Sequence, residues 1–146
     1  MFRTPQEIME TYLNEVAKNG NLDLIDELAH EDMLDEANQI FGGPKGRDGF
    51  KAHVVGFQRN ITDATLEIKE IVGGNKQAMA WWQFSGHHTG PWLGINPTGQ
   101  KISGTVFSFF DITEGKIARY RLWLCAYLPQ KVVFDTSTGN MPQIVD

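Results

Sequence analysis

The fold is decided by residues 101–128, which read KISGTVFSFFDITEGKIARYRLWLCAYL. Apolar, aromatic and β-branched residues alternate with smaller or polar ones on both sides of Thr113-Glu114-Gly115. This is the pattern of two half-buried strands joined by a tight turn. We therefore predict antiparallel strands near 101–112 and 116–128.

The same alternation continues upstream of this hairpin. Residues 65–72 and 77–88 show it, with Gly73-Gly74-Asn75 as the turn between them and Pro91–Gln100 as a longer loop before the next strand. The sequence from about residue 65 onward therefore predicts a four-stranded antiparallel sheet.

The first sixty residues show helical spacing of apolar side chains instead. Thr4-Pro5-Gln6-Glu7 begins one helix with a capping box, a short second helix follows over 22–29, and Phe50–Phe57 marks a third after the glycine-rich loop 42–46. Residues 32–39 are too polar and irregular to assign. Helices that precede an antiparallel sheet predict an α+β domain in which the helices cover one face of a curved sheet.

Length and composition place the chain among ordinary globular proteins. It has 146 residues, of which 41% are hydrophobic and 21% charged, so one domain over residues 1–130 with a polar tail over 131–146 is expected. The longest apolar run is far shorter than the ~20 residues that span a bilayer, and no leader-like segment opens the chain. We expect a cytoplasmic protein that does not bind membranes.

Charge and cysteine content exclude further classes. The net charge is −5, and the basic residues are scattered among acidic ones rather than gathered on one face, which argues against nucleic-acid binding. The single cysteine, Cys125, excludes an internal disulfide and a multi-cysteine metal site. No histidine has a metal-ligand partner at a suitable spacing, so no metal is expected.

Five short phrases along the chain carry a family resemblance: Gly20–Asp23, Gly46–Phe50, Gly86–Gly90, Gly94–Lys101 and Gly115–Ile117. In their order and separation they resemble the SnoaL-like polyketide cyclases, members of the nuclear-transport-factor-2-like superfamily. The resemblance covers about Pro5 to Gln130.

The resemblance implies a cone-shaped α+β barrel, with three N-terminal helices packed on a strongly curved, mostly antiparallel sheet and an apolar pocket at the wide end. It also implies a small-molecule ligand and a homodimer formed through the sheet. Characterised members close a polyketide ring by an intramolecular aldol reaction, with no metal or organic cofactor. We therefore expect no cofactor here.

The catalytic residue that the resemblance implies is replaced in this chain. The family commonly places an acid–base aspartate several residues after the Gly-Lys-Ile phrase, where this sequence has Cys125. A thiol has an ordinary pKa near ~8.5, which apolar burial raises, so it is a poor substitute. His88, in the Gly-x-His-x-Gly phrase, and Asp111, one strand earlier, are the candidates that could compensate.

Strand alternation places Arg119, Arg121, Trp123 and Cys125 on one face. If that face lines the pocket, Arg121 could hold an enolate or carboxylate. The substrate-binding candidates are Trp82, Phe84, Phe107, Phe109, Arg121 and Trp123. Each aromatic residue among them could equally be ordinary core packing.

The remaining polar candidates carry less weight. His53 lies on an apolar helix face and is expected to be a satisfied core histidine, whereas His30 and His87 are expected at the surface. Glu36 and Asn38 fall in a region where family members place polar residues toward the cavity.

These observations favour a cyclase-like or isomerase-like enzyme that acts by general acid–base chemistry on a largely apolar, oxygenated small molecule. The alternative is a non-catalytic binding protein of the same fold, because Cys125 stands at the aspartate position. A third hypothesis, an interaction module that uses the sheet, rests on the abundant strand aromatics.

Overall fold

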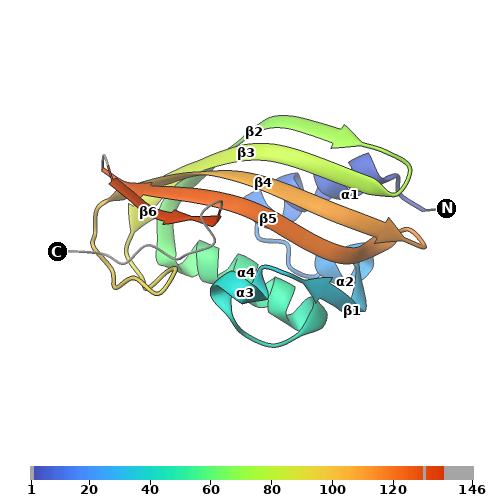
Figure 1. The fold of residues 1–146 in the computed structure, drawn as a ribbon, viewed down its shortest axis with the longest axis horizontal. Helices are drawn as coiled ribbons and strands as arrows, with labels where there is room; N and C mark the ends of the chain where they lie inside the picture. Colours follow the sequence, from blue (N-terminus) through green and yellow to red (C-terminus); the bar gives the residue numbers. More distant parts are fainter. Residues whose placement is uncertain (1, 130, 137–146) are drawn as a thin grey trace.

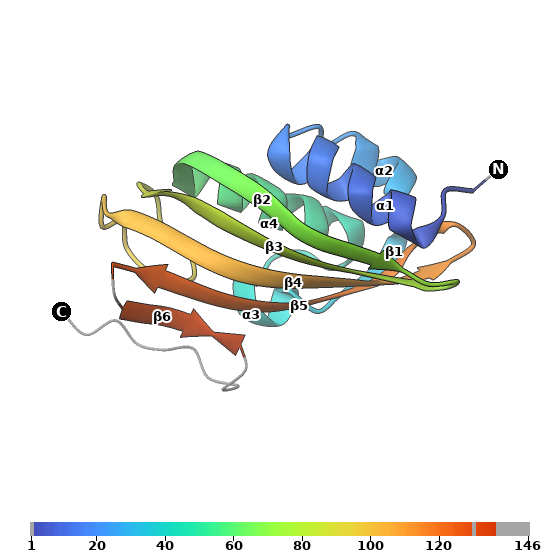
Figure 2. The ribbon, with the colours of Figure 1, turned by 90° about the horizontal axis from the view of Figure 1, so that it is seen from above.

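A twisted six-stranded sheet forms one layer of the molecule, and the helices lie on one face of it (Figure 1, Figure 2). The computed structural model describes residues 2–129 and 131–136. The strands are β1 (Ala29–Asp35), β2 (Ile61–Gly73), β3 (Gln77–His88), β4 (Lys101–Thr113), β5 (Lys116–Leu128) and β6 (Lys131–Asp135).

The strand order is β1-β5-β4-β3-β2, and β6 also pairs with β5. All pairs are antiparallel except β1 with β5. Both β1 and β6 lie along β5, β1 opposite Ile117–Tyr120 and β6 opposite Cys125–Leu128. The sheet wraps around the helices but does not close into a complete barrel.

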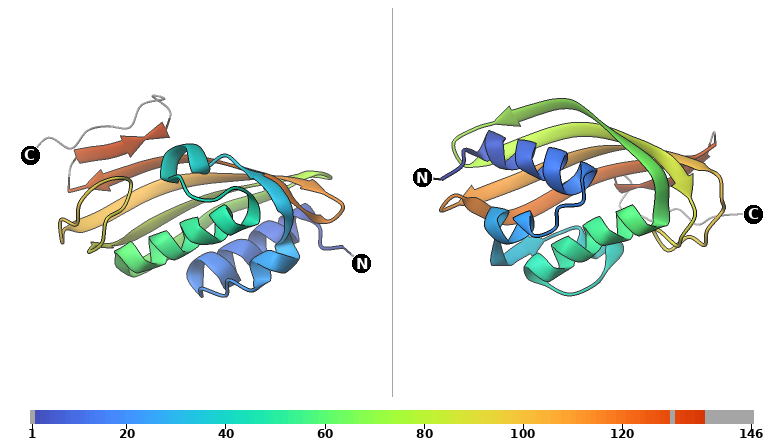
Figure 3. Two further views of the ribbon diagram at one scale, coloured as in Figure 1. Left: turned by 90° about the horizontal axis from the view of Figure 1, so that it is seen from below. Right: turned by 180° about the vertical axis from the view of Figure 1, so that it is seen from behind.

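The helices are α1 (Pro5–Thr11), its π-helical continuation η1 (Tyr12–Lys18), α2 (Leu24–Leu28), α3 (Asn38–Phe41) and α4 (Gly46–Asn60). The predicted capping box at the start of α1 is confirmed, because Thr4 Oγ1 accepts from the Glu7 amide at 3.1 Å and Glu7 accepts from the Thr4 amide at 2.9 Å. Both views in Figure 3 place α1 and α4 on the same face of the sheet.

The predicted α+β architecture is confirmed: helices come first, and four long strands at the predicted places follow. Two strands were not predicted. β1 falls largely in the unassigned stretch, because its partner β5 lies more than eighty residues away in the chain and leaves no local signal. β6 occupies the first residues of the predicted tail, where it pairs with β5. Residues 137–146 lie outside the described residues.

Side chains alternate between the two faces of β3 and β4, and of β5 from Arg119 onward, after a register shift between Ile117 and Arg119. The even-numbered residues of β4, from Ile102 to Ile112, are buried beneath the helices, with Gly104 among them. A Cβ atom at Gly104 would lie 2.4 Å from the Phe84 ring, so glycine there makes room for Phe84 on the inner face. This inner face and the helices enclose the core.

Candidate functional site

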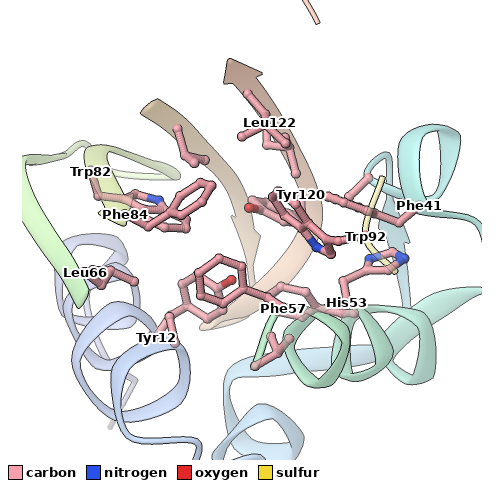
Figure 4. A pocket seen from close by; sticks show the side chains of 16 residues that line it. Tyr12, Phe41, His53, Phe57, Leu66, Trp82, Phe84, Trp92, Tyr120 and Leu122 are labelled. Atoms are coloured by element: carbon pink, nitrogen blue, oxygen red, sulfur yellow. The ribbon is translucent and has the colours of Figure 1, made fainter. Parts of the chain in front are cut away.

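An internal cavity of about 70 Å³ lies between the inner face of the sheet and the helices. Its sixteen lining residues come from η1, α3, α4, the loop after β3 and strands β2 to β5 (Figure 4). Most of them are aliphatic or aromatic. The polar groups are those of Tyr12, His53, Tyr120 and the indoles of Trp82 and Trp92.

A larger and more polar hollow of about 740 Å³ adjoins this cavity. It lies between the C-terminal ends of η1 and α4 and the start of β2. The two spaces share the lining residues Ala17, Phe57 and Leu66, so these three side chains form the boundary between the apolar interior and a surface hollow.

His53 reaches the cavity from the buried face of α4 and pairs with Asp35 at the end of β1. Nδ1 of His53 lies 2.8 Å from Oδ2 of Asp35, whose side chain is completely buried. The other carboxylate oxygen of Asp35 accepts from the Ala37 amide at 2.9 Å, and Nε2 of His53 donates to the Gly42 carbonyl oxygen at 2.8 Å. Both ring nitrogens therefore face acceptors, an arrangement that suits the imidazolium form.

The pKa of His53 reflects opposing effects. Burial lowers it, but the hydrogen bonds to Asp35 and to the Gly42 carbonyl, together with the Asp35 charge, raise it above the ordinary histidine value. His53 is consequently a titratable group paired with a buried carboxylate at the wall of an apolar cavity.

Hydroxyl groups approach the cavity from η1 and β5. The Trp82 indole N–H donates to Ser108 Oγ at 3.0 Å, and Ser108 Oγ lies 3.1 Å from the Tyr120 hydroxyl. The rings of Tyr12 and Tyr120 lie against each other, with their centres 6.3 Å apart. Burial is the main cause that raises the pKa of both tyrosines, so both remain protonated donors.

Comparison with known proteins agrees with this architecture. The sequence model of the SnoaL-like polyketide cyclases matches residues 7–125. The chain belongs to this family. No curated protein matches the chain significantly.

Solved structures of other proteins have the same fold. TsrD from Streptomyces laurentii superimposes with a TM-score of 0.71 at 24% identity, over 82% of this chain and 86% of TsrD. A SnoaL-like polyketide cyclase from Agrobacterium tumefaciens superimposes with a TM-score of 0.67 at 18% identity, over 86% of this chain and 92% of that one. At these identities the likeness establishes the fold alone.

The described part of this SnoaL-like protein has neither a membrane-spanning helix nor a cluster of metal ligands. Among residues 2–129 and 131–136, no helix is both long and apolar enough to span a membrane. In the same part of the chain, no three His, Cys, Asp or Glu side chains converge as metal ligands would. The cytoplasmic location stays a prediction.

The expected orientation of β5 is wrong for this SnoaL-like chain. Tyr120, Leu122 and Leu124 line the cavity, which puts Arg121 and Cys125 on the outer face of the sheet. Strand alternation shows which residues share a face, but the packing of the helices decides which face is inside.

The other predicted site residues divide between the two faces. Trp82 and Phe84 line the cavity as expected. Phe107 and Trp123 lie on the outer face with 40% and 48% of their surface exposed. Phe109 is also on that face, where the Arg121 guanidinium lies 4.1 Å from the centre of its ring.

Asp111 does not reach the cavity either. Its carboxylate accepts from Arg121 at 3.2 Å and from the Gln77 amide at 2.7 Å, all on the outer face. Asp111 therefore does what turn-proximal aspartates commonly do, which is to pair with a nearby arginine. Cys125 is half-buried opposite Thr105, away from the cavity.

His88 is fully buried but does not line the cavity. Its Nδ1 lies 3.1 Å from Thr98 Oγ1, and its backbone bonds to Gly99 and Gln100 fasten the loop after β3 to the strand end. Burial is the main cause that lowers the pKa of His88, so the ring is neutral at physiological pH. Its geometry is that of a residue that holds a loop.

The remaining polar residues considered in the sequence analysis contact other groups of the protein or solvent. Glu36 accepts from Arg119 at 2.7 Å, and Asn38 donates to the Pro44 carbonyl. His30 bonds to the Thr113 carbonyl, and His87 is exposed as expected.

Sequence reasoning missed the polar groups that do reach the cavity. His53 was interpreted as core because it lies on an apolar helix face, and that position is also what directs it toward the cavity. Asp35 had no signal, because β1 was not predicted. Tyr12 and Tyr120 follow the apolar pattern of their elements, so nothing in the sequence separates them from core aromatics.

Proposed function

We propose that this SnoaL-like protein is an enzyme of the cyclase or isomerase type, which moves protons on a largely apolar, oxygenated small molecule. The observation that carries the proposal is the His53–Asp35 pair at the wall of an apolar cavity. Asp35 holds the Nδ1 proton and orients the ring, which leaves Nε2 as the atom that exchanges a proton with substrate.

The reaction needs one local change. Nε2 is bonded to the Gly42 carbonyl in the free protein, so a substrate must displace this carbonyl, which belongs to the glycine-rich loop before α4. When the substrate displaces this carbonyl, His53 releases its Nε2 proton to solvent and keeps the Nδ1 proton against Asp35. The neutral Nε2 then takes a proton from a carbon next to a carbonyl group and leaves an enolate. The enolate carbon attacks a second carbonyl carbon of the same molecule, and the Nε2 proton passes to the oxygen of that carbonyl.

The size of the cavity bears on how the substrate lies. Typical small-molecule sites enclose about 300–1,000 Å³. The inner cavity of about 70 Å³ is smaller, so we infer that the reacting end occupies it while the remainder extends past Phe57 and Leu66 into the adjoining hollow.

The proposal is tested with acetophenone as a small carbon acid. Enzyme-dependent replacement of its methyl protons by solvent deuterium, followed by NMR, reports proton abstraction without knowledge of the natural substrate. We expect exchange above the buffer rate in the wild type and roughly 100-fold or more slower exchange in His53→Gln, within the range assigned to general acid–base catalysis. His87→Gln is the matched control and should exchange as the wild type does.

A second candidate function, non-catalytic binding, is favoured by the inner face of β5, where Leu122 and Leu124 present only apolar groups to the cavity. If acetophenone raises the melting temperature of the wild type and yet exchanges no faster than in buffer, the enzyme proposal fails and binding alone remains.

We also propose a homodimer formed through the outer face of the sheet. Trp81, Phe107 and Trp123 lie directly opposite one another on β3, β4 and β5 and are all exposed, and the first two rings stack. A contiguous aromatic strip can pair with its own copy about a two-fold axis, which covers both strips at once.

A further inference from the structure

Three hydroxyl groups gather at the wall of the cavity, and those of Ser108 and Tyr120 form a hydrogen-bonded chain. Ser108 lies behind the wall, whereas Tyr12 and Tyr120 line the cavity from η1 and β5. Figure 4 shows both tyrosines projecting toward the space in which the aromatic side chains meet. The Trp82 indole donates to Ser108 Oγ and so fixes one end of the chain.

The protons of this chain do not all find acceptors. The hydroxyl groups of Ser108 and Tyr120 carry two protons, and the hydrogen bond between them uses one. The Trp82 indole supplies its own proton and uses only a lone pair of Ser108. Within the part of the chain that the structure describes, no other acceptor bonds to these hydroxyls. At least one hydroxyl proton is therefore left over.

The left-over proton belongs on a tyrosine. Ser108 has the Tyr120 hydroxyl as its acceptor, and a proton turned away from it would lie behind the wall without any partner. If Ser108 donates to Tyr120, the free proton resides on Tyr120. A buried donor without an acceptor is costly, and both tyrosine hydroxyls border a space that a ligand can enter.

We propose that the Tyr120 hydroxyl at the end of this chain, together with the Tyr12 hydroxyl on the same cavity wall, is a binding site for a carbonyl or enolate oxygen of the ligand. Such an oxygen accepts the left-over proton and brings none of its own. The surrounding wall is apolar, with Leu66, Phe84 and Leu122 among its members, so negative charge that develops on the oxygen is stabilised more strongly there than in water. The assignment rests on the proposed function and narrows its substrate class to ketones and their enolates.

The test uses 4-nitrophenol as a stable stand-in for an enolate, because its phenol and phenolate forms absorb at different wavelengths. Equilibrium dialysis and absorbance spectra give the affinity and the ionised fraction of the bound probe. We expect the wild type to bind the phenolate and Tyr120→Phe to bind it roughly 10- to 100-fold more weakly, the usual loss for a hydrogen bond to a charged group. Tyr12→Phe should show a loss in the same direction.

Two controls separate the hydroxyl effect from damage to the cavity. Nitrobenzene lacks the phenolic oxygen, so its affinity should be the same in the wild type and in Tyr120→Phe. Tyr127→Phe removes a hydroxyl from the outer face of β5 and should leave phenolate binding unchanged. The proposal is overturned if wild type binds neither probe, if both cavity variants bind phenolate as wild type does, or if they lose nitrobenzene equally.

The outcome is independent of proton abstraction. His53→Gln should retain the preference for phenolate that depends on Tyr120, even where acetophenone exchange is lost. Phenolate binding without acetophenone exchange in the wild type would refute the enzyme proposal and leave the oxygen site standing. Acetophenone exchange without a preference for phenolate that depends on Tyr120 would refute the oxygen site and leave the enzyme proposal standing.

Discussion

Replacement of His53 by leucine should destabilise the protein severely, because it leaves a buried carboxylate without its ion-pair partner. The side chain of Asp35 is 0% exposed, and after the change its remaining hydrogen bond is the one from the Ala37 amide. Removal of one member of a buried pair costs about 3–5 kcal/mol, which corresponds to a fall in melting temperature of roughly 6–20 °C for a chain of this size.

The structure provides a matched control on the surface. His87 lies 4.0 Å from Asp63, and the side chains are 53% and 88% exposed. His87→Leu should therefore cost less than about 1 kcal/mol. Urea unfolding followed by tryptophan fluorescence compares the two variants, with an unchanged m-value required for the comparison.

The dependence on pH adds a second signature. The pKa of His53 is raised in the folded protein, so its contribution to stability is complete below the ordinary value near ~6.5 and is lost as the pH rises through the raised value. The difference between wild type and His53→Leu should therefore be larger at pH 6 than at pH 9.

The double variant Asp35→Asn/His53→Leu removes the unpaired charge while an amide oxygen remains for Ala37, so it should be more stable than His53→Leu alone. The reasoning is refuted if His53→Leu loses no more free energy of unfolding than His87→Leu, or if the double variant is the less stable of the two.

Three further predictions concern other parts of the molecule. Phe107→Lys and Trp123→Lys should each shift the mass in light scattering from dimer to monomer while circular dichroism stays unchanged, and a monomeric wild type would contradict the proposed interface. Thr4→Ala removes the N-cap of α1 and should cost about 0.5–2 kcal/mol in urea unfolding, whereas an unchanged midpoint would mean that the capping box contributes nothing. The lowered pKa of His88 means that its contribution to stability is present above pH ~6.5 and is lost as the pH falls through the lowered value. The protection factor of the Gly99 amide, which corrects for the intrinsic slowing of exchange toward acid pH, should therefore fall from pH 7 to pH 5 in wild type but not in His88→Gln.

Elements with a strong local pattern could be predicted from sequence. The capping box at Thr4 and the turn at Thr113–Gly115 are set by neighbouring residues, and β3, β4 and β5 each contain a long run of alternating residues. β1 could not be predicted, because a parallel strand paired with β5 takes its stability from residues that are distant in the chain.

The candidate site shows the same division. Trp82 and Phe84 were predicted to line the cavity, and both do. They lie two residues apart on one strand, so their side chains point to the same face of the sheet. On β5 the prediction grouped the residues correctly but assigned them to the wrong face. Arg121, Trp123 and Cys125 share a face, and it is the outer face of the sheet. Both faces of this strand carry bulky residues, so its composition favours neither.

The sequence by itself determined the α+β class, the family and the residues that share each strand face, because those properties depend on spacing along the chain. The tertiary structure alone decided which face of β5 the helices cover, and it brought Asp35 from β1 against His53 from α4. Eighteen positions separate these two residues in the chain, and only the burial of both elements against the same core places a carboxylate and an imidazole 2.8 Å apart.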